Sequence, residues 1–547
     1  MTLKNKIIVA DNTESKGKFL PEIALFLGML IILLLRSKVL GMPFERDEGE
    51  FAYMGQLILK GLMPYTDAYN MKLPGTYWMY ALIIKIFGAT PTGIHTGLTI
   101  VTLLSMYFMF AVVKSLFNAP VAVLTAFVYG LMVSAKSTLG FAGHATHFIV
   151  LFLMIGLWCY VHWRQGQKLY WLLLFGVCIG FAFLMKQQAI FFILMGGIMV
   201  LVEWMNSQNK SFSKLLTNIL IFTFGVILPY LLTLLWISAQ GDFTKFWFWT
   251  VEYARKYTTS VVQWKDAPMM FYLSFKSMWA EFPLVWLTAL GGIATLWFSD
   301  YTKAQKQFLI IFFIFSFLTI CPGLYFRQHY FITWIPSLVL FSSLFFYWLA
   351  QKISQSAFVQ NAVMVVAALV ILLYSYNHNK SYWATKNVNM LSKDIYGTNP
   401  FVESKEIAAY IKRNSSPTDK IAVLGSEPQI MVYADRISAT GHIYTYGMME
   451  KQSYNVKMQK EMIKEIEEDK PKFIVFCKVG LSWMEYTDSP KNIFEWMPKY
   501  IDKNYEMVGQ VEVTNSNTGE FFWDAKALGR QPLSENHIVV FRRKPNI

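Results

Sequence analysis

Four charged side chains stand close together directly after the first apolar run of the chain. Arg46, Asp47, Glu48 and Glu50 fall within five residues. A carboxylate at a partly dry membrane edge has a raised proton affinity, which a nearby arginine opposes, so Asp47 is a candidate general base. The segment equally suits a helix start in which Asp47 is the N-cap and Glu50 is the acid three residues later. Spacing alone leaves both interpretations open.

Three basic side chains lie at the edges of apolar runs, where they could bind a phosphate. Lys72 precedes a Leu-Pro pair, Lys186 separates two apolar runs, and Arg327 opens a late run that continues with His329 and Tyr330. A guanidinium group suits bidentate phosphate binding. Basic and aromatic side chains also serve as simple anchors at membrane interfaces, so a structural role is the alternative for each.

Two histidines, His144 and His147, are three residues apart. On a helix this spacing places both rings on one face, and two rings could begin a metal site. No third ligand follows at a recognisable spacing. We therefore predict no metal site and no required cofactor, with a divalent metal left open.

The composition indicates a polytopic α-helical membrane protein. Of 547 residues, 55% are hydrophobic and only 15% are charged, against roughly 25% charged in soluble domains. Before residue 377, apolar runs of about 18–22 residues recur, long enough to cross a bilayer as helices. The net charge of +14 comes from basic residues scattered between these runs. Cytoplasmic loops of membrane proteins collect such residues, so a membrane topology explains the charge better than nucleic acid binding.

About eleven spans are expected, and their approximate ranges are 20–35, 92–113, 119–140, 146–163, 169–185, 188–205, 215–237, 282–299, 307–321, 329–349 and 358–376. Lysines before the first span place the N-terminus in the cytoplasm. An odd number of spans then places the long loops 42–91 and 238–281, and the C-terminal part, on the outer side. In the first loop we expect an interfacial helix over 48–60, ended by Gly61, and a second interfacial or re-entrant helix over 76–87.

Two domains follow from these patterns. Residues 1–376 form the transmembrane domain, and residues 377–547 form an extracytoplasmic soluble α/β domain. In the second domain, helices are expected over 403–413 and 454–469. Strands are expected over 420–425, 472–477, 505–513, 520–523 and 537–542. Alternating strands and helices favour a mixed or partly parallel sheet.

Taken together, the motifs resemble the GT-C superfamily of membrane glycosyltransferases. The resemblance is strongest to the branch of protein O-mannosyltransferases and aminoarabinose transferases. It rests on Asp47-Glu48 after the first span, on a Gly-x-x-Pro-Tyr-x-Asp turn that contains Tyr65 and Asp67, and on Lys72 in a Lys-x-Pro. Further similar segments are Gly180–Gln187, Arg327–Tyr330 with Pro336, and Ile421–Tyr433. One departure is that relatives carry an acid near the start of the fourth span, where this chain has histidines.

The resemblance implies an enzyme of the plasma (inner) membrane that moves a sugar from a polyprenyl-phosphate donor to a lipid, glycan or protein acceptor. Asp47 would be the base of an inverting displacement, supported by Glu48. Lys72, Lys186 and Arg327 would bind the donor phosphate. Substrate contacts are implied for Tyr65, Asp67, His147, His329 and Tyr330. The alternative is a transporter or flippase of lipid-linked saccharides, which commonly contains internal repeats; none is visible in the sequence.

Overall fold

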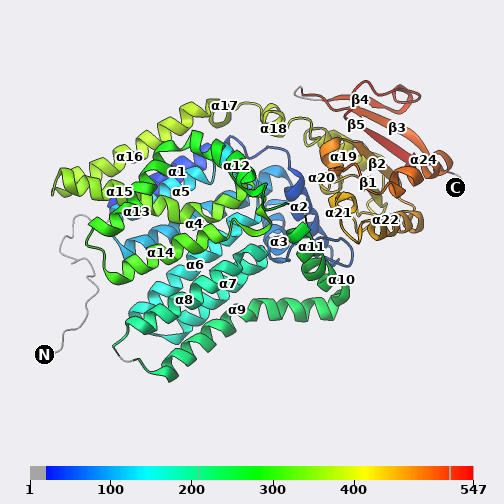
Figure 1. Ribbon diagram of the computed structural model, residues 1–547. Helices are drawn as coiled ribbons and strands as arrows, with labels where there is room; N and C mark the ends of the chain where they lie inside the picture. The colour runs from blue at the N-terminus through cyan, green and yellow to red at the C-terminus, as the bar shows by residue number, and fades with distance from the viewer. Residues whose placement is uncertain (1–19, 209, 261, 516–518, 546–547) are drawn as a thin grey trace. The chain divides into compact units, whose positions relative to one another are not determined.

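A computed structural model describes residues 20–208, 210–260, 262–515 and 519–545 of the chain (Figure 1). The described residues form two compact units, each made of three segments of sequence. The helical unit contains the described residues of Met1–Ser37, Leu98–Leu232 and Trp264–Ala384. The mixed unit contains Lys38–Gly97, Thr233–Gln263 and the described residues of Thr385–Ile547. The predicted boundary between residues 376 and 377 stays a prediction, and the N-terminal lysines used to orient the chain lie outside the described residues.

The helical unit is built from long apolar helices joined by short turns. Its helices are α1 (Leu20–Ser37), α5 (Ala119–Met132), α6 (Ala145–Gly166), α7 (Leu169–Met185), α8 (Ile190–Asn206), α12 (Ala267–Glu281), α13 (Pro283–Phe298), α14 (Lys303–Leu318), α15 (Ile335–Ile353), α16 (Ala357–His378) and α17 (Lys380–Trp383). Two helices, α4 (Pro91–Leu116) and α9 (Phe212–Gln240), belong partly to each unit. Short turns are η1 (Lys136–Thr138), η2 (Gln187–Ala189), η4 (Pro322–Leu324) and η5 (Gln328–Thr333).

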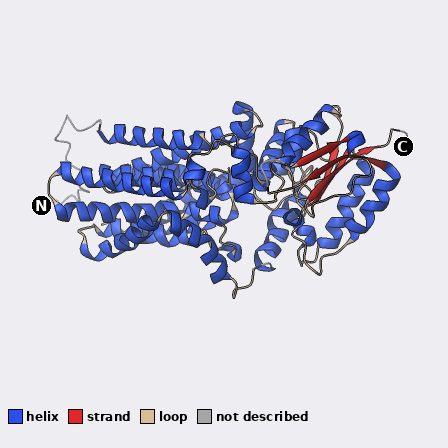
Figure 2. Cartoon of the chain, turned by 90° about the horizontal axis from the view of Figure 1, so that it is seen from above, coloured by secondary structure: helices blue, strands red, loops and turns tan. Residues whose placement is uncertain are grey.

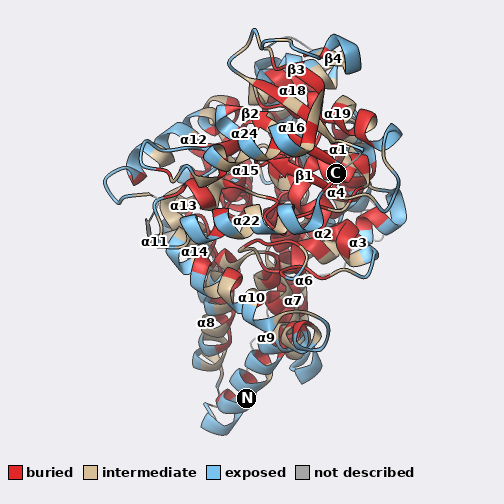
Figure 3. Ribbon diagram, turned by 90° about the vertical axis from the view of Figure 1, so that its right-hand side faces the viewer, coloured by how far each residue is buried: buried red, intermediate tan, exposed pale blue. Residues whose placement is uncertain are grey.

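Six of the described helices are long and apolar enough to cross a membrane, or seven if α12 and α13, which meet at a 102° bend, form one broken span. Each of the eleven predicted spans contains a helix, but several of these helices are shorter than predicted; α5, for example, ends at Met132. The length and composition of the described helices therefore indicate fewer membrane spans than the eleven predicted. Many large apolar side chains on these helices are exposed, including Phe358 at 82% and Phe212 at 71% (Figure 3). Such a surface is suited to lipid rather than water.

The mixed unit combines helices with one five-stranded sheet, which contains all the strands drawn in Figure 2. The strands are β1 (Ile421–Leu424), β2 (Phe473–Lys478), β3 (Tyr505–Glu512), β4 (Glu520–Trp523) and β5 (His537–Arg543), in the order β1-β2-β5-β3-β4. The first pair is parallel and the other pairs are antiparallel. The predicted mixed sheet is thus confirmed, and each strand lies within two residues of its predicted bounds. The apolar sequences of β1 and β2 suit strands that are covered on both faces.

The helices of the mixed unit come from all three of its segments. They are α2 (Arg46–Leu59), α3 (Gly75–Phe87), α10 (Phe243–Trp247), the π-helix η3 (Phe248–Tyr253), α11 (Ala254–Ser260), α18 (Val388–Tyr396), α19 (Glu403–Arg413), α20 (Gln429–Ala434), α21 (Tyr446–Met449), α22 (Asn455–Asp469), α23 (Gly480–Trp483), α24 (Asn492–Asn504) and the short turn η6 (Asp524–Lys526). The predicted helices of the first loop and of the C-terminal part are present. The predicted external loop over 238–281 is also mostly helical, and its location outside the membrane stays a prediction.

Helix α2 begins with a capping box that differs from the predicted one. The side chain of Glu45 accepts from the backbone of Glu48, and the side chain of Glu48 accepts from the backbone of Glu45. The predicted N-cap at Asp47 is therefore wrong by two residues. Glu45 with Glu48 and Asp47 with Glu50 have the same spacing, so the sequence does not distinguish the two capping boxes. The helix ends as predicted, with Gly61 at a φ of +77°, which favours glycine. Position 49 on α2 needs a glycine for a steric reason, because a Cβ there would lie 2.7 Å from the backbone nitrogen of Gln429 on α20.

Candidate active site

An ion cluster of Asp47, Glu50 and Lys72 lies at the start of α2. The Lys72 Nζ is 3.1 Å from Asp47 Oδ1 and 2.6 Å from Glu50 Oε2. The helix brings the two carboxylates together, because residues three apart share a face. The loop before α3 supplies the lysine. The structural role predicted for Glu50 did not include this ion pair with Lys72.

The two carboxylates of this ion cluster differ in their surroundings. The Glu50 side chain is fully buried, whereas the Asp47 side chain is 20% exposed. Glu50 also accepts from the Tyr77 hydroxyl at 3.1 Å, and Asp47 Oδ1 accepts from the Tyr444 hydroxyl at 3.3 Å. The more exposed carboxylate is the one that a substrate could reach.

Burial and charge set the protonation states around Lys72. Burial raises the pKa of Glu50, although the Lys72 ammonium opposes the rise. Burial acts to lower the pKa of Lys72, but the carboxylates of Asp47 and Glu50 overcome it and hold the pKa above its usual value. Lys72 is therefore a permanent cation beside Asp47. An adjacent cation favours the ionised form of a carboxylate, which is the form a general base needs.

Arg46 fixes the first turn of α2 to the C-terminal segment of the mixed unit. Its buried guanidinium donates to Glu427 Oε1 and to the Ser426 carbonyl, both at 2.5 Å. It also donates to Asn399 Oδ1 at 2.9 Å and to the Tyr446 hydroxyl at 2.8 Å. This set of charge-assisted bonds holds the residue next to Asp47 in one orientation. The sequence analysis had considered Arg46 only as a charge near the base.

Glu48 makes a buried contact that the sequence analysis missed. His95, on the first turns of α4, places Nε2 2.9 Å from Glu48 Oε1 and Nδ1 2.9 Å from the Leu40 carbonyl. The predicted catalytic support by Glu48 is untested, but its position is defined by this histidine. Burial, together with the charges of Asp47 and Glu48, raises the pKa of Glu45 well above its usual value.

The loop between α2 and α3 contains two residues predicted to bind substrate. Tyr65 is buried, has a φ of +71°, and donates to the backbone carbonyl of Lys72 at 2.7 Å. Asp67 accepts from the Met63 backbone nitrogen at 2.8 Å. These bonds order the loop that carries Lys72. Substrate contacts by Tyr65 and Asp67 stay predictions.

The remaining predicted site residues lie in the helical unit. The Lys186 Nζ lies 3.8 Å from the centre of the Tyr330 ring, which is a cation–π contact. Arg327 lies over the Tyr325 ring at 5.3 Å. Lys186 follows α7 directly, and Arg327 precedes η5, so turns at helix ends present both cations. Within this unit, the structure brings Lys186 and Tyr330 together.

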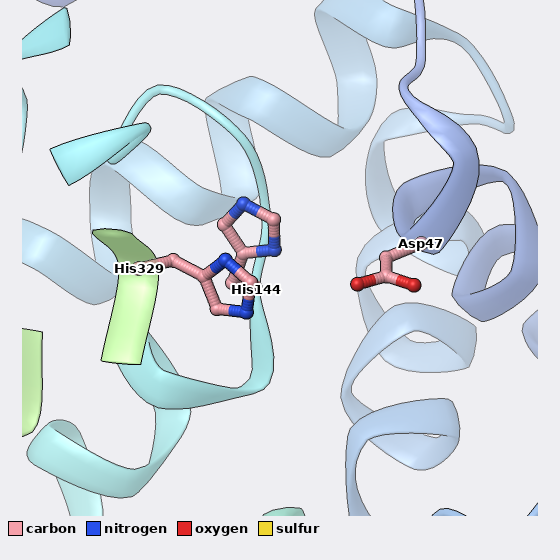
Figure 4. A group of neighbouring side chains, drawn as sticks. All are labelled: Asp47, His144 and His329. Carbon is pink, nitrogen blue, oxygen red and sulfur yellow. The ribbon is translucent and has the colours of Figure 1, made fainter. Parts of the chain in front are cut away.

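The rings of His144 and His329 stack face to face, with centroids 3.8 Å apart and planes 12° apart (Figure 4). His144 precedes α6 in an extended conformation, with φ −63° and ψ 147°, whereas His147 lies inside the helix. The expectation that His144 and His147 share one helix face is therefore wrong. The backbone turns just before α6, so His144 pairs with a residue far away in sequence instead. The prediction that no metal is required stays a prediction.

Comparisons with known proteins match one family model and several curated relatives to parts of the chain. The family model "Dolichyl-phosphate-mannose-protein mannosyltransferase" matches residues 71–236, a range that includes Lys72 and Lys186. Two curated relatives are undecaprenyl phosphate-alpha-4-amino-4-deoxy-L-arabinose arabinosyl transferases of Pseudomonas fluorescens (strain Pf0-1). Transferase 2 is 26% identical over 278 residues, which is 49% of this chain and 49% of that protein. Transferase 1 is 23% identical over 390 residues, which is 68% of this chain and 66% of that protein. The chain thus spans about half of the length of transferase 2 and about two thirds of the length of transferase 1.

Two solved structures share the fold. The structure of ArnT from Cupriavidus metallidurans bound to undecaprenyl phosphate has a TM-score of 0.56 and 13% identity, over 96% of this chain and 98% of that one. The structure of the oligosaccharyltransferase AglB from Archaeoglobus fulgidus, in complex with an inhibitory peptide and a dolichol-phosphate, has a TM-score of 0.54 and 15% identity, over 95% and 76%. The expected fold class, a polytopic helical membrane protein with a C-terminal α/β part, is confirmed. The chain therefore has the GT-C fold that these two structures share.

Proposed function

We propose that the protein is an integral membrane glycosyltransferase that moves a sugar from a polyprenyl-phosphate donor to an acceptor hydroxyl or amine. The observation that carries this proposal is the ion cluster of Asp47, Glu50 and Lys72 in a chain with the GT-C fold. The curated relatives act with undecaprenyl-phosphate-linked aminoarabinose, so such a donor is the first one to test.

Asp47 is the proposed general base. Its carboxylate takes the proton of the acceptor group while the acceptor heteroatom bonds to the anomeric carbon. The bond between that carbon and the phosphate oxygen breaks, and the oxygen keeps the electron pair. Polyprenyl phosphate leaves as an anion, and the single displacement inverts the anomeric centre. The bond that Lys72 donates to Asp47 Oδ1 orients the base and keeps it ionised.

The donor phosphate needs cations that remain charged as the leaving group forms. Lys186 and Arg327 fill this role in the proposal, because charge-assisted bonds to a phosphate are stronger than neutral ones. Lys72 was predicted to join them. Its hydrogen bonds to the carboxylates of Asp47 and Glu50 instead support a role in setting the orientation and protonation state of Asp47.

The location of the reaction also belongs to the proposal. Apolar helices and the relatives support a multi-pass protein of the inner membrane. We further propose that the ion cluster and the C-terminal α/β part face the outer side, with the N-terminus in the cytoplasm. Accessibility labelling of single cysteines placed at exposed positions of β4 and of the α7–α8 region would test this orientation in intact cells.

Transfer by the purified protein tests the function itself. Detergent-solubilised protein would be given undecaprenyl phosphate-4-amino-4-deoxy-L-arabinose or polyprenyl-phosphate mannose, with envelope lipids and glycans as acceptors. Formation of a labelled glycoconjugate together with free polyprenyl phosphate would support the proposal. Movement of an intact lipid-linked sugar across proteoliposomes, with no bond broken, would support a flippase instead.

A further inference from the structure

The buried contact between His95 and Glu48 determines how many protons the two side chains hold. A backbone carbonyl only accepts hydrogen bonds, so the His95 Nδ1 facing the Leu40 carbonyl at 2.9 Å carries a hydrogen. The 2.9 Å contact between Nε2 and Glu48 Oε1 needs a second proton, because two bare lone pairs would repel. The proton can reside on either partner, and the pair has zero net charge in both cases.

Three parts of the first segment of the mixed unit, Lys38–Gly97, meet at this pair. Leu40 lies before α2, Glu48 lies on its first turn, and His95 lies on α4. Both side chains are buried, at 2% and 1% side-chain exposure. Glu48 is at the same time the capping residue that accepts from the Glu45 backbone. Any movement of His95 therefore moves the capped turn, and Asp47 lies within that turn.

The charges around the pair show why its neutrality matters. Glu48 faces Glu45 through the capping box, and it adjoins Asp47 in the chain. It also lies close enough to Tyr80 and Tyr433 for its charge to raise the pKa of both hydroxyls, together with burial. The basic side chain that forms an ion-pair contact with Glu48 is His95, at 2.9 Å. Without His95, Glu48 would add a negative charge to a buried group of acids.

We propose that His95 is a positioning residue for the glycosyl transfer, acting through a neutral, proton-sharing pair with Glu48. The pair holds the first turn of α2 and leaves Asp47 as the accessible acid. This proposal rests on the proposed function for its catalytic consequence, but the pair itself can be tested without any turnover. His95 touches no substrate in this account.

Two substitutions separate the two bonds of the ring. In His95→Gln the amide nitrogen can take the place of Nε2 and still donate to Glu48. In His95→Asn the shorter amide takes the place of Nδ1 and can donate only to the Leu40 carbonyl. We expect His95→Asn to lower kcat at least tenfold with little change in KM, since small displacements of a catalytic group are costly. His95→Gln should stay within about threefold of the wild type.

A double-substitution cycle with Glu48→Gln tests whether the effect passes through Glu48. His95→Asn should cost little more in the Glu48→Gln background, because coupled residues are not additive. The control is His442→Gln, which alters another histidine–carboxylate contact of the mixed unit, 3.1 Å from Glu461, and should leave kcat unchanged. If His95→Asn is as active as His95→Gln, or if the effects simply add, the proposal is wrong.

Nitrogen-15 spectra of histidine-labelled protein test the pair directly. The protein has 8 histidines, and the signal missing from His95→Gln identifies His95. We expect Nδ1 to be protonated from neutral to mildly acidic pH, with Nε2 in a strong hydrogen bond. The neutral tautomer with a hydrogen on Nε2 and a bare Nδ1 would overturn the proposal. If the wild type transfers no sugar, the proposed function fails, and this spectrum still decides whether the pair exists.

Discussion

The Lys72 ammonium lies 2.6 Å from a carboxylate oxygen of the fully buried Glu50, and the same nitrogen lies 3.1 Å from Asp47. One cation thus serves two acids that differ in exposure. The positive charge of Lys72 compensates the burial of the Glu50 carboxylate, whereas the Asp47 carboxylate is partly open to solvent. The arrangement separates a buried residue that holds Lys72 in place from a partly exposed residue that Lys72 also contacts.

Replacing Lys72 tests this division. In Lys72→Met the buried Glu50 loses its cation, and removing one partner of a buried ion pair costs about 3–5 kcal/mol. We expect a lower midpoint of thermal unfolding in detergent and a loss of sugar transfer. In the double variant Lys72→Met with Glu50→Gln, stability should largely return while transfer stays low. Recovery of both properties would show that Lys72 has no influence on the reaction.

The raised pKa of Glu50 predicts a pH dependence of stability. Burial raises the folded-state pKa above the ordinary glutamate value, with Lys72 opposing. The folded state therefore binds the proton more tightly than the unfolded state. The contribution of Glu50 protonation to folding stability is complete below the pKa of Glu50 in the unfolded chain. It is lost as the pH rises through the pKa of Glu50 in the folded protein. In Glu50→Gln, the midpoint of thermal unfolding should depend less on pH between these two pKa values. An unchanged pH dependence would contradict the raised pKa of Glu50.

The ion pair of Arg46 and Glu427 should be important for stability. Its side chains are 10% and 0% exposed. Glu427→Ala leaves a buried guanidinium without its carboxylate, and we expect a loss of about 3–5 kcal/mol. The matched control is Asp469→Ala, which breaks the exposed pair of Lys420 and Asp469 and should cost about 0–1 kcal/mol. Equal thermal shifts in the two variants would argue against a special role for Arg46.

Lys186 should bind the donor phosphate. A hydrogen bond to a charged group contributes about 1.5–3 kcal/mol, so Lys186→Met should weaken the binding of undecaprenyl phosphate about 10- to 100-fold. Lys186→Arg should retain most of the affinity. The control is Lys168→Met at the opposite end of α7, an exposed position that should not matter. Unchanged affinity in Lys186→Met, measured by competition with a labelled lipid phosphate, would remove Lys186 from the proposed site.

Residue patterns were sufficient to predict the strands of the C-terminal part. The segment 472–477 was predicted as a strand and β2 covers Phe473–Lys478, because a short run of β-branched and aromatic residues after a charged helix has few other solutions. For the external loop over 238–281 no helices were predicted, and α10, η3, α11 and α12 form there. Interleaved aromatic and charged residues do not show a clean helical period.

The candidate site was only partly predictable from the sequence. Asp47 and Lys72 were identified through motifs, but the cap was assigned to Asp47 when Glu45 provides it. Two pairs of acids with equal spacing compete for that role, and only long-range contacts distinguish them. His95 was missed because a single histidine near the start of an apolar run gives no local signal. Its partner Glu48 is 47 positions away in sequence.

Sugar transfer by Asp47→Asn is the most direct test of the proposed mechanism. The substitution keeps the size of the side chain and removes its basicity, and general-base catalysis contributes about 10²–10⁴-fold to a rate. The assay measures labelled sugar on the acceptor together with released polyprenyl phosphate, with Asp435→Asn as the surface control. We predict a loss in that range with unchanged thermal unfolding and unchanged binding of undecaprenyl phosphate. Full transfer by correctly folded Asp47→Asn would contradict the assignment of Asp47 as the base.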